Sequence, residues 1–266
     1  MMKKKLIGLL RKIGLIKYMD YLRFIIIYLK SRKLIKSFRN KYPNVKTPPP
    51  FYIYETFGID YFKYYEGGKR TAIWLKQFFD KHSKNTDLKI LDWGCGPART
   101  IRHFNEIYGD SCSLYASDYN KKYIKWCSEN IDNVTFKNNE LKPPLKFESN
   151  FFDVVYGISI FTHLSHEMHI AWFNELFRVL KPGGILFLTL HGKAFREKLT
   201  KSERELFDNE ELVIKTSSKE GHRTYAAFQP VSYVKNLLKE NQLLEHIEGK
   251  VKNDKPEQDI WIMRKK

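Results

Sequence analysis

Residues 90–100 have the sequence ILDWGCGPART, and this segment constrains the fold more than any other part of the chain. Its apolar residues end in a glycine turn that carries a carboxylate, Asp92, and a proline follows where a helix can begin. A second apolar run, residues 114–117, ends at Asp118. This order is typical of a cofactor site at the carboxyl edge of a parallel sheet: a strand, a glycine turn, a helix, and a second strand that ends in an acidic residue. The segment therefore predicts a doubly wound α/β fold.

The charges of this turn indicate which cofactor suits it. A dinucleotide fingerprint needs a third glycine after Gly94 and Gly96, but Arg99 occupies that position. Asp92 would also repel a phosphate, so a cofactor with a cationic group and no phosphate fits better. S-adenosylmethionine (SAM) carries a sulfonium, an ammonium and a ribose, and the two glycines let the backbone approach it closely. Cys95 is counted with this cofactor-binding loop as a small filler side chain without a catalytic role.

Two residues at the end of the second strand are cofactor-binding candidates. Asp118 can accept both ribose hydroxyls as charge-assisted hydrogen bonds, and Tyr119 can pack on the adenine face. The plainer interpretations are a helix cap for Asp118 and core packing for Tyr119. An ordinary strand–turn–helix without a cofactor is the corresponding alternative for the glycine turn, and the acid at position 118 speaks against it.

From about residue 57 to the C-terminus the chain resembles the class I SAM-dependent methyltransferases. The resemblance rests on four segments, residues 90–100, 115–120, 152–164 and 176–192. It implies a Rossmann-like, mostly parallel seven-stranded sheet that closes with an antiparallel hairpin. Residues 139–145 and 161–164 are similar to bacterial methyltransferases associated with glycan biosynthesis. That narrower similarity implies a glycan or small-molecule acceptor, methylated at oxygen.

The resemblance also suggests further site residues. In the family a polar side chain after the third strand commonly meets the adenine amino group, and Asn139 or Glu140 can do so here. His163 follows the fourth strand, on the edge where the acceptor should lie, and is the candidate catalytic base. Its alternative is a structural histidine. His163, His166 and His169 do not have metal-ligand spacing, so we predict no metal site.

The positive charge of the chain is concentrated at the N-terminus. The net charge is +17, and residues 1–46 hold fourteen lysines and arginines against one acid, Asp20. We expect a basic, amphipathic helical extension there with two apolar stripes. The first is formed by Leu6, Leu9, Leu10, Ile13 and Ile16, and the second by Leu22, Ile25, Ile26 and Leu29. It either lies on an anionic membrane surface or packs on the catalytic domain or a second subunit. No apolar run reaches the ~20 residues of a membrane span.

The rest of the chain, residues 47–266, is predicted to form the methyltransferase domain. Prolines 48–50 are expected to be an extended linker, and a helix is expected at about 68–82. Strands are expected near 89–92, 114–118, 134–136, 152–158, 185–190, 243–251 and 259–264, with helices near 98–108, 120–130, 166–180 and 232–241. Residues 193–230 are expected to build the acceptor pocket. His222 and Arg223 could contact an anion there, but a solvated charged surface is the favoured interpretation of these two residues.

Composition and motifs separate the competing functions. Three cysteines without paired or metal-ligand spacing predict a reduced, cytoplasmic protein, placed peripherally at the inner membrane surface if its basic extension binds there. An RNA methyltransferase is the alternative that the charge suggests, but the segment after the fourth strand, Gly157 to Ile160, lacks the D/N-P-P-Y/F motif of base amino methylation. The basic excess also lies outside the catalytic core, so a nucleic-acid partner is not expected. A non-catalytic SAM-binding scaffold is the remaining alternative.

Overall fold

The computed structural model describes residues 16–83, 87–109, 111–215, 220–221 and 225–266. The chain divides into two compact units, residues 1–67 and 68–266, and the division falls inside α4 (Tyr61–His82). We describe each unit by itself. The predicted functional boundary after residue 46 therefore lies within the first unit and stays a prediction.

The first unit is held together by an aromatic cluster. It contains α2 (Ile16–Lys41), α3 (Pro50–Phe57) and the start of α4. Its fully or nearly buried side chains are Ile35, Phe38, Ile53, Tyr54, Ile59, Tyr61 and Tyr64. The hydroxyl of Tyr61 donates to the carbonyl of Pro48 at 2.9 Å, and the hydroxyl of Tyr54 donates to the carboxylate of Asp20 at 2.7 Å. Since burying a tyrosine hydroxyl without a partner is costly, these bonds fix the aromatic packing.

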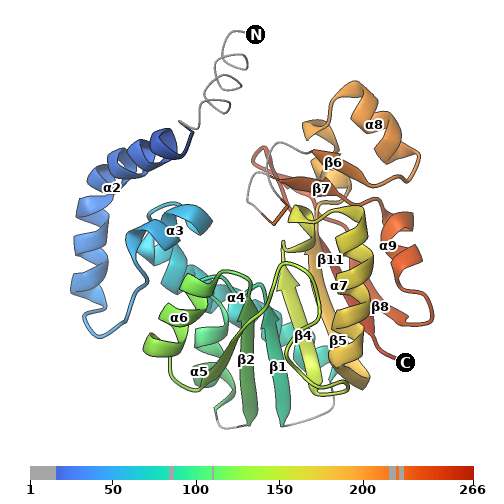
Figure 1. Ribbon diagram of the computed structural model, residues 1–266, viewed down its shortest axis with the longest axis horizontal. Coiled ribbons are helices and arrows are strands. Elements are labelled where there is room, and N and C mark those ends of the chain that lie inside the picture. The colour runs from blue at the N-terminus through green and yellow to red at the C-terminus, as the bar shows by residue number, and fades with distance from the viewer. Residues whose placement is uncertain (1–15, 84–86, 110, 216–219, 222–224) are drawn as a thin grey trace. The chain divides into compact units, whose positions relative to one another are not determined.

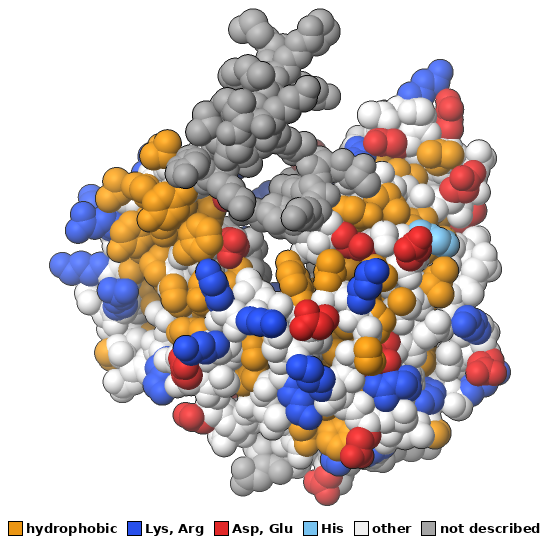
Figure 2. All heavy atoms as spheres, viewed as in Figure 1, with side chains coloured by type: hydrophobic (Ala, Val, Ile, Leu, Met, Phe, Trp, Pro, Cys, Tyr) orange, Lys and Arg blue, Asp and Glu red, His pale blue; other side chains and the backbone are white. Residues whose placement is uncertain are grey.

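Three expectations for this unit need correction or refinement. The helix expected from residue 68 already begins at Tyr61, and Pro50 is the first residue of α3, a position where proline costs nothing. Leu6, Leu9, Leu10 and Ile13 of the first predicted stripe lie outside the described residues. Within the second predicted stripe, Leu22, Ile26 and Leu29 are exposed, and the core is met by a different face of α2. Figure 2 shows apolar side chains gathered over this part of the molecule.

The second unit is built on a seven-stranded sheet with the strand order β3-β2-β1-β4-β5-β11-β8. The first five strands of that order run parallel, and β11 pairs antiparallel with both β5 and β8. The strands are β1 (Leu88–Trp93), β2 (Cys112–Asp118), β3 (Val134–Asn138), β4 (Phe152–Ile158), β5 (Leu180–Leu190), β8 (Gln242–Ile247) and β11 (Asp259–Arg264). The predicted doubly wound, mostly parallel seven-stranded sheet with its closing antiparallel hairpin is confirmed, although β5 begins at Leu180 rather than near 185.

Helices cover both faces of this sheet, as Figure 1 shows. On one face, α7 (His166–Val179) and α9 (Val231–Leu237) pack on side chains such as Leu91, Val155 and Leu188. On the other, α4, α5 (Phe104–Tyr108) and α6 (Lys121–Asn130) pack on the alternate residues, such as Ile90 and Phe187. Since successive side chains of a strand point to opposite faces, a strand buried on both faces must be apolar throughout. The run that predicted β4 is apolar except for Asp153, whose carboxylate pairs with the Lys181 ammonium at 2.8 Å.

Residues 193–230 form a small substructure after β5. It consists of the short helix η3 (Lys193–Lys198), α8 (Lys201–Asp208) and the paired strands β6 (Val213–Lys215) and β7 (Ala226–Phe228). Their apolar side chains make a cluster of their own, formed by Phe195, Leu199, Phe207, Val213 and Phe228. Near the C-terminus, β9 (Val251–Lys252) and β10 (Lys255–Pro256) pair around a turn at Asn253 and Asp254, both of which have positive φ.

Candidate functional site

The glycine turn after β1 is held against the end of β2 by its backbone. The N–H groups of Gly94 and Cys95 both donate to the carbonyl of Ser117, at 2.8 and 3.0 Å. Gly94 has a φ of +76°, and a Cβ on it would lie 2.3 Å from Cδ1 of Ile160. Only glycine fits this position without strain or a clash. At Gly94 the turn therefore exposes backbone without a side chain at the carboxyl edge of the sheet.

Asp118 ends β2 and binds the same turn. One of its carboxylate oxygens accepts the N–H of Gly96 at 2.9 Å, and the other accepts the N–H of Asn120 at 2.7 Å. Burial raises the pKa of Asp118 to about 6, although these two N–H groups favour the ionised form. Each carboxylate oxygen can accept more than one hydrogen bond, so the ionised group retains capacity for two hydroxyls.

Asp92 lies buried beneath the turn. Burial raises the pKa of Asp92 to about 7, although the nearby Tyr156 hydroxyl and the charge of Arg99 favour the ionised form. Of the predicted cofactor residues, Asp92, Cys95 and Gly96 are outside the described lining of the pocket. Gly96 and Cys95 shape the turn, since the Cys95 thiol donates to the Gly96 carbonyl. Their contact with a cofactor stays a prediction.

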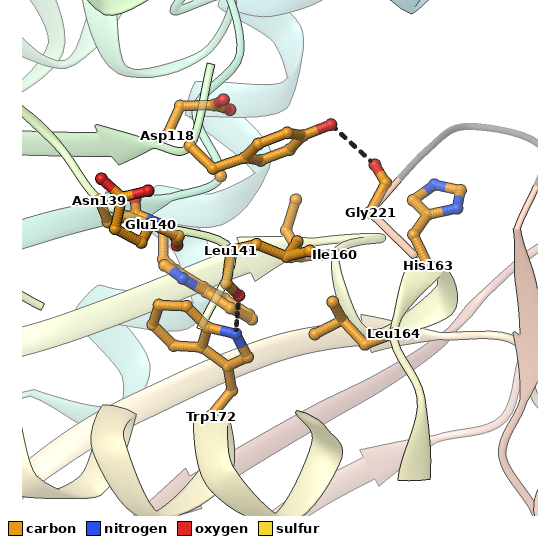
Figure 3. A pocket seen from close by; sticks show the side chains of 12 residues that line it. Asp118, Asn139, Glu140, Leu141, Ile160, His163, Leu164, Trp172 and Gly221 are labelled. Atoms are coloured by element: carbon orange, nitrogen blue, oxygen red, sulfur yellow. Dashed lines mark hydrogen bonds between the residues drawn. The ribbon is translucent and has the colours of Figure 1, made fainter. Parts of the chain in front are cut away.

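A pocket opens in front of the turn at the carboxyl edge of the sheet (Figure 3). Asp118 and Asn139 lie at one end of the view and His163 at the other, with Ile160 and Leu141 between them. The lining comprises Trp93, Gly94, Asp118, Tyr119, Asn139, Glu140, Leu141, Ile160, His163, Leu164, Trp172 and Gly221. Six of the nine predicted site residues thus meet around one cavity.

Asn139 presents an unused acceptor. Its side-chain N–H donates to the Glu140 carbonyl at 2.6 Å, and its backbone N–H donates to the Asp118 carbonyl at 3.2 Å. Its carbonyl oxygen Oδ1 is buried and accepts no hydrogen bond. A buried polar atom without a partner is costly, so the site fits a ligand that brings an N–H donor. Glu140 is exposed, with its carboxylate 4.0 Å from the Lys121 ammonium.

Two tryptophans form an apolar wall that the sequence reasoning missed. The rings of Trp93 and Trp172 have centroids 4.9 Å apart, and the indole N–H of Trp172 donates to the carbonyl of Leu141 at 2.9 Å. This bond ties α7 to the loop that follows β3. Trp172 belongs to the ordinary apolar stripe of α7, which carries no chemical signal in the sequence.

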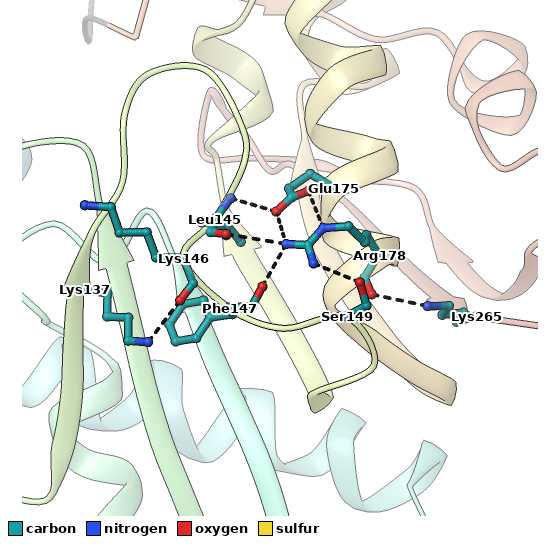
Figure 4. A network of polar contacts seen from close by, with 8 residues as sticks. All are labelled: Lys137, Leu145, Lys146, Phe147, Ser149, Glu175, Arg178 and Lys265. Carbon is teal, nitrogen blue, oxygen red and sulfur yellow. Dashed lines mark hydrogen bonds and ion pairs between the residues drawn. The ribbon is translucent and has the colours of Figure 1, made fainter.

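The loop after β3 is fixed to α7 by a polar network (Figure 4). The guanidinium of Arg178 donates to both carboxylate oxygens of Glu175, at 2.8 and 2.6 Å, and to the carbonyl of Phe147 at 2.9 Å. Glu175 is buried and accepts the backbone N–H of Leu145 at 2.7 Å. A buried charge needs such pairing. The network holds the loop whose other end carries Asn139.

His163 is oriented by the β7 side of the pocket. It lies in η2 (Phe161–His163), and its Nδ1 is 2.8 Å from the carbonyl of Tyr225. A carbonyl only accepts, so Nδ1 carries the hydrogen, and in the neutral ring Nε2 is the basic nitrogen. The backbone N–H of Gly221 donates to the His163 carbonyl at 2.9 Å. The residue therefore has a defined tautomer at the end of the pocket opposite Asp118.

The stretch 193–230 contributes to the pocket through Gly221, whose carbonyl accepts the hydroxyl of Tyr119 at 3.0 Å. The predicted anion contacts His222 and Arg223 lie outside the described residues. Within the described part of the chain, no group of three or more His, Cys, Asp or Glu side chains has the arrangement of a metal site.

Comparison with known proteins identifies the domain. Residues 90–184 match a family model described as a methyltransferase domain. The chain is 35% identical over 104 residues to the sterol 24-C-methyltransferase of Schizosaccharomyces pombe, covering 36% of this chain and 26% of that protein. It is 29% identical over 137 residues to the ubiquinone/menaquinone biosynthesis C-methyltransferase of Wigglesworthia glossinidia brevipalpis, covering 48% and 53%. The chain thus spans about a quarter to a half of the length of these curated relatives.

The fold is also similar to that of a solved methyltransferase structure. A SAM-dependent methyltransferase of Methanosarcina mazei superposes with a TM-score of 0.54 at 20% sequence identity, covering 71% of this chain and 96% of that one. Residues 90–184 thus match a methyltransferase domain, and the second unit has the fold of a SAM-dependent methyltransferase structure.

Proposed function

We propose that this chain, whose second unit contains a class I methyltransferase domain, transfers a methyl group from SAM to an oxygen atom of a small-molecule or glycan acceptor. One observation carries the proposal: a single pocket has Asp118 and Asn139 at one end and an oriented imidazole, His163, at the other. This separation supports a cofactor end and an acceptor end.

The residues at the cofactor end fit the functional groups of SAM. Asp118 has acceptor capacity for the ribose hydroxyls, and the buried Oδ1 of Asn139 suits the adenine amino group. Tyr119 and Trp93 offer aromatic surface, and Gly94 leaves room beside the backbone. When bound, SAM supplies a methyl group on a cationic sulfur, which leaves readily, so the protein mainly has to align the acceptor and exclude water. Orientation of that kind can supply ~7–11 kcal/mol of a reaction barrier.

His163 would act on the acceptor. Because Nδ1 donates its hydrogen to the Tyr225 carbonyl, Nε2 is the nitrogen that can take a proton from the acceptor. A hydroxyl acceptor has to lose its proton as the methyl group arrives, which makes a positioned base worth typically ~10²–10⁴-fold in rate. An amine or a stabilised carbanion needs less help, so the base favours oxygen.

A non-catalytic scaffold or an RNA methyltransferase has less support. The chain has Asp92, Gly94, Gly96 and Asp118 together, and this combination is an argument against a non-catalytic scaffold. For RNA, the basic excess belongs to residues 1–46 and not to the catalytic unit.

We further propose a cytoplasmic protein whose N-terminal extension places it at the inner membrane surface. In the described part of the chain, no helix has the length and apolarity needed to cross a bilayer.

Calorimetry of the full chain with SAM, S-adenosylhomocysteine and NAD tests the cofactor end. Binding of the first two and not of NAD is expected, and tight NAD binding without a response to SAM would refute the proposal. The acceptor is found by incubating the protein with methyl-labelled SAM and a cell extract, and following the label into glycan, lipid, RNA and small-molecule fractions. Label on a carbon or nitrogen atom would overturn the oxygen assignment, and label in RNA would favour the alternative.

A further inference from the structure

One face of α2 remains outside the aromatic core of the first unit. Met19, Leu22, Ile26 and Leu29 are 50%, 58%, 54% and 54% exposed. Their spacing of three, four and three residues places them in one stripe along the helix. The core is met instead by the opposite side, through residues such as Phe24, Ile35 and Phe38. The stripe is therefore a surface and not a buried seam.

The same stripe changes character along the helix. Continuing the spacing by four and three residues leads to Lys33 and Lys36, both exposed. Three further exposed cations, Lys30, Arg32 and Arg39, surround them in the second half of α2. Asp20 is the one acidic residue of α2, and its carboxylate accepts the Tyr54 hydroxyl. The outward face is thus apolar in its first half and cationic in its second.

We propose that this outward face of α2 docks on the surface of an anionic lipid bilayer. The aliphatic half would enter the boundary between headgroups and acyl chains, while the lysines would meet lipid phosphates. The helix lies on the bilayer rather than across it, because its second half is too charged to enter hydrocarbon.

Charge favours a bilayer over a second copy of this chain. Two copies packed in parallel through the stripe would bring two cationic helix halves together, and like charges at close range repel. Packed antiparallel, each cationic half would lie on the aliphatic half of the other copy, where the one acidic residue of α2 is Asp20, whose carboxylate already accepts the Tyr54 hydroxyl. An anionic bilayer instead offers phosphates to the lysines and an apolar layer to the aliphatic side chains. The inference does not depend on methyl transfer: its test does not involve activity, and a failed methyltransferase assay would leave it intact.

The test is flotation of the full chain with vesicles of phosphatidylcholine, with and without phosphatidylglycerol. The protein is expected to float with the anionic vesicles at ~0.1 M salt and to be released at ~1 M, where the Debye length falls from about 10 Å to about 3 Å. It should stay unbound with pure phosphatidylcholine. Absence of flotation with anionic vesicles at low salt overturns the proposal.

Two pairs of variants locate the surface. Leu22→Asn with Ile26→Asn should weaken binding to anionic vesicles at least about tenfold, since two exposed aliphatic side chains no longer enter the apolar boundary. The matched control is Ile73→Asn with Ile170→Asn, which replaces two exposed isoleucines of the second unit and should bind like the unmodified chain. Equal binding by both double variants would show that this face is not the docking surface.

The charge pair is Lys33→Gln with Lys36→Gln. At roughly fivefold per lysine, this double variant should bind about 25-fold more weakly and with a smaller salt dependence. Its control, Lys122→Gln with Lys125→Gln on α6, removes the same charge from the second unit and should have little effect. Circular dichroism confirms that each variant is folded.

A different outcome is that the chain does not bind vesicles and sedimentation shows a dimer. If the Leu22 and Ile26 double variant is then monomeric, the face is an interface between copies and the proposal is wrong.

Discussion

Replacing Gly94 by alanine separates backbone strain from a steric clash in the glycine turn. An alanine at φ +76° costs about 1–2 kcal/mol in backbone energy. Its Cβ would also lie 2.3 and 2.6 Å from Cδ1 and Cγ1 of Ile160, well inside normal contact. Overpacking of this kind costs typically about 1–3 kcal/mol. We therefore expect Gly94→Ala to lower the free energy of unfolding by about 2–5 kcal/mol and to weaken SAM binding, because Ile160 is pushed into the pocket.

A matched control is available at Gly183. It has a φ of +79°, and nothing lies within 4 Å of its missing Cβ, so Gly183→Ala should cost only the backbone share of about 1–2 kcal/mol. All five tryptophans of the chain lie in the second unit, so their fluorescence during urea unfolding reports on it.

A second substitution tests the clash directly. Ile160→Ala removes both clashing atoms, so the loss measured for Gly94→Ala together with Ile160→Ala should be about 1–3 kcal/mol smaller than the sum of the two single losses. If Gly94→Ala and Gly183→Ala are equally destabilised, or if the double variant is additive, the steric argument is refuted.

Four further predictions concern single residues. His163→Gln should lower turnover by about 10²-fold or more while SAM affinity stays unchanged by calorimetry, and His166→Gln, as a control, should retain activity. Asp118→Ala should lose at least about 1.5 kcal/mol of SAM affinity, and an unchanged affinity would move the ribose contact elsewhere. Because burial raises the pKa of Asp92 to about 7, the apo protein should lose up to about 4 kcal/mol of stability as pH rises from about 4 to about 7; Asp92→Asn should flatten that slope in denaturation curves. Arg178→Ala leaves its buried carboxylate partner alone and should cost about 2–4 kcal/mol in urea unfolding, with loss of SAM affinity as the loop after β3 loosens.

Much of the sheet could be predicted because its central strands are buried on both faces and therefore appear in the sequence as apolar runs. The run from Phe152 to Ile158 is almost continuously apolar, as required of a strand covered on both faces, and its bounds were predicted correctly. By contrast, β6 and β7 have three residues each, too few for any periodicity to stand out. On α2, apolar residues occur on both sides of the helix, so periodicity alone could not tell which side is buried.

The site was predicted as far as its residues carry chemistry. Asp118 stands out because a carboxylate follows a strand end, and the family resemblance suggests Asn139 and His163. The structure brings all three to one pocket. Trp172 was missed because an aromatic residue in a helix stripe looks like any core residue. Gly221 was missed because its place depends on the fold of residues 193–230, which no local pattern encodes.

The position of β11 has a consequence for synthesis of the chain on the ribosome. β8 has a single neighbour in the sheet, β11, which lies between it and β5 although it is made last. Until residues 259–264 emerge, β8 cannot join the sheet and the outer edge of β5 lacks its partner. Unpaired strand edges of this kind attract other chains. If translation stalls after β8, the glycine turn after β1 has already been synthesised, but the edge of β5 is still unpaired. A cell must shield or degrade such a nascent chain.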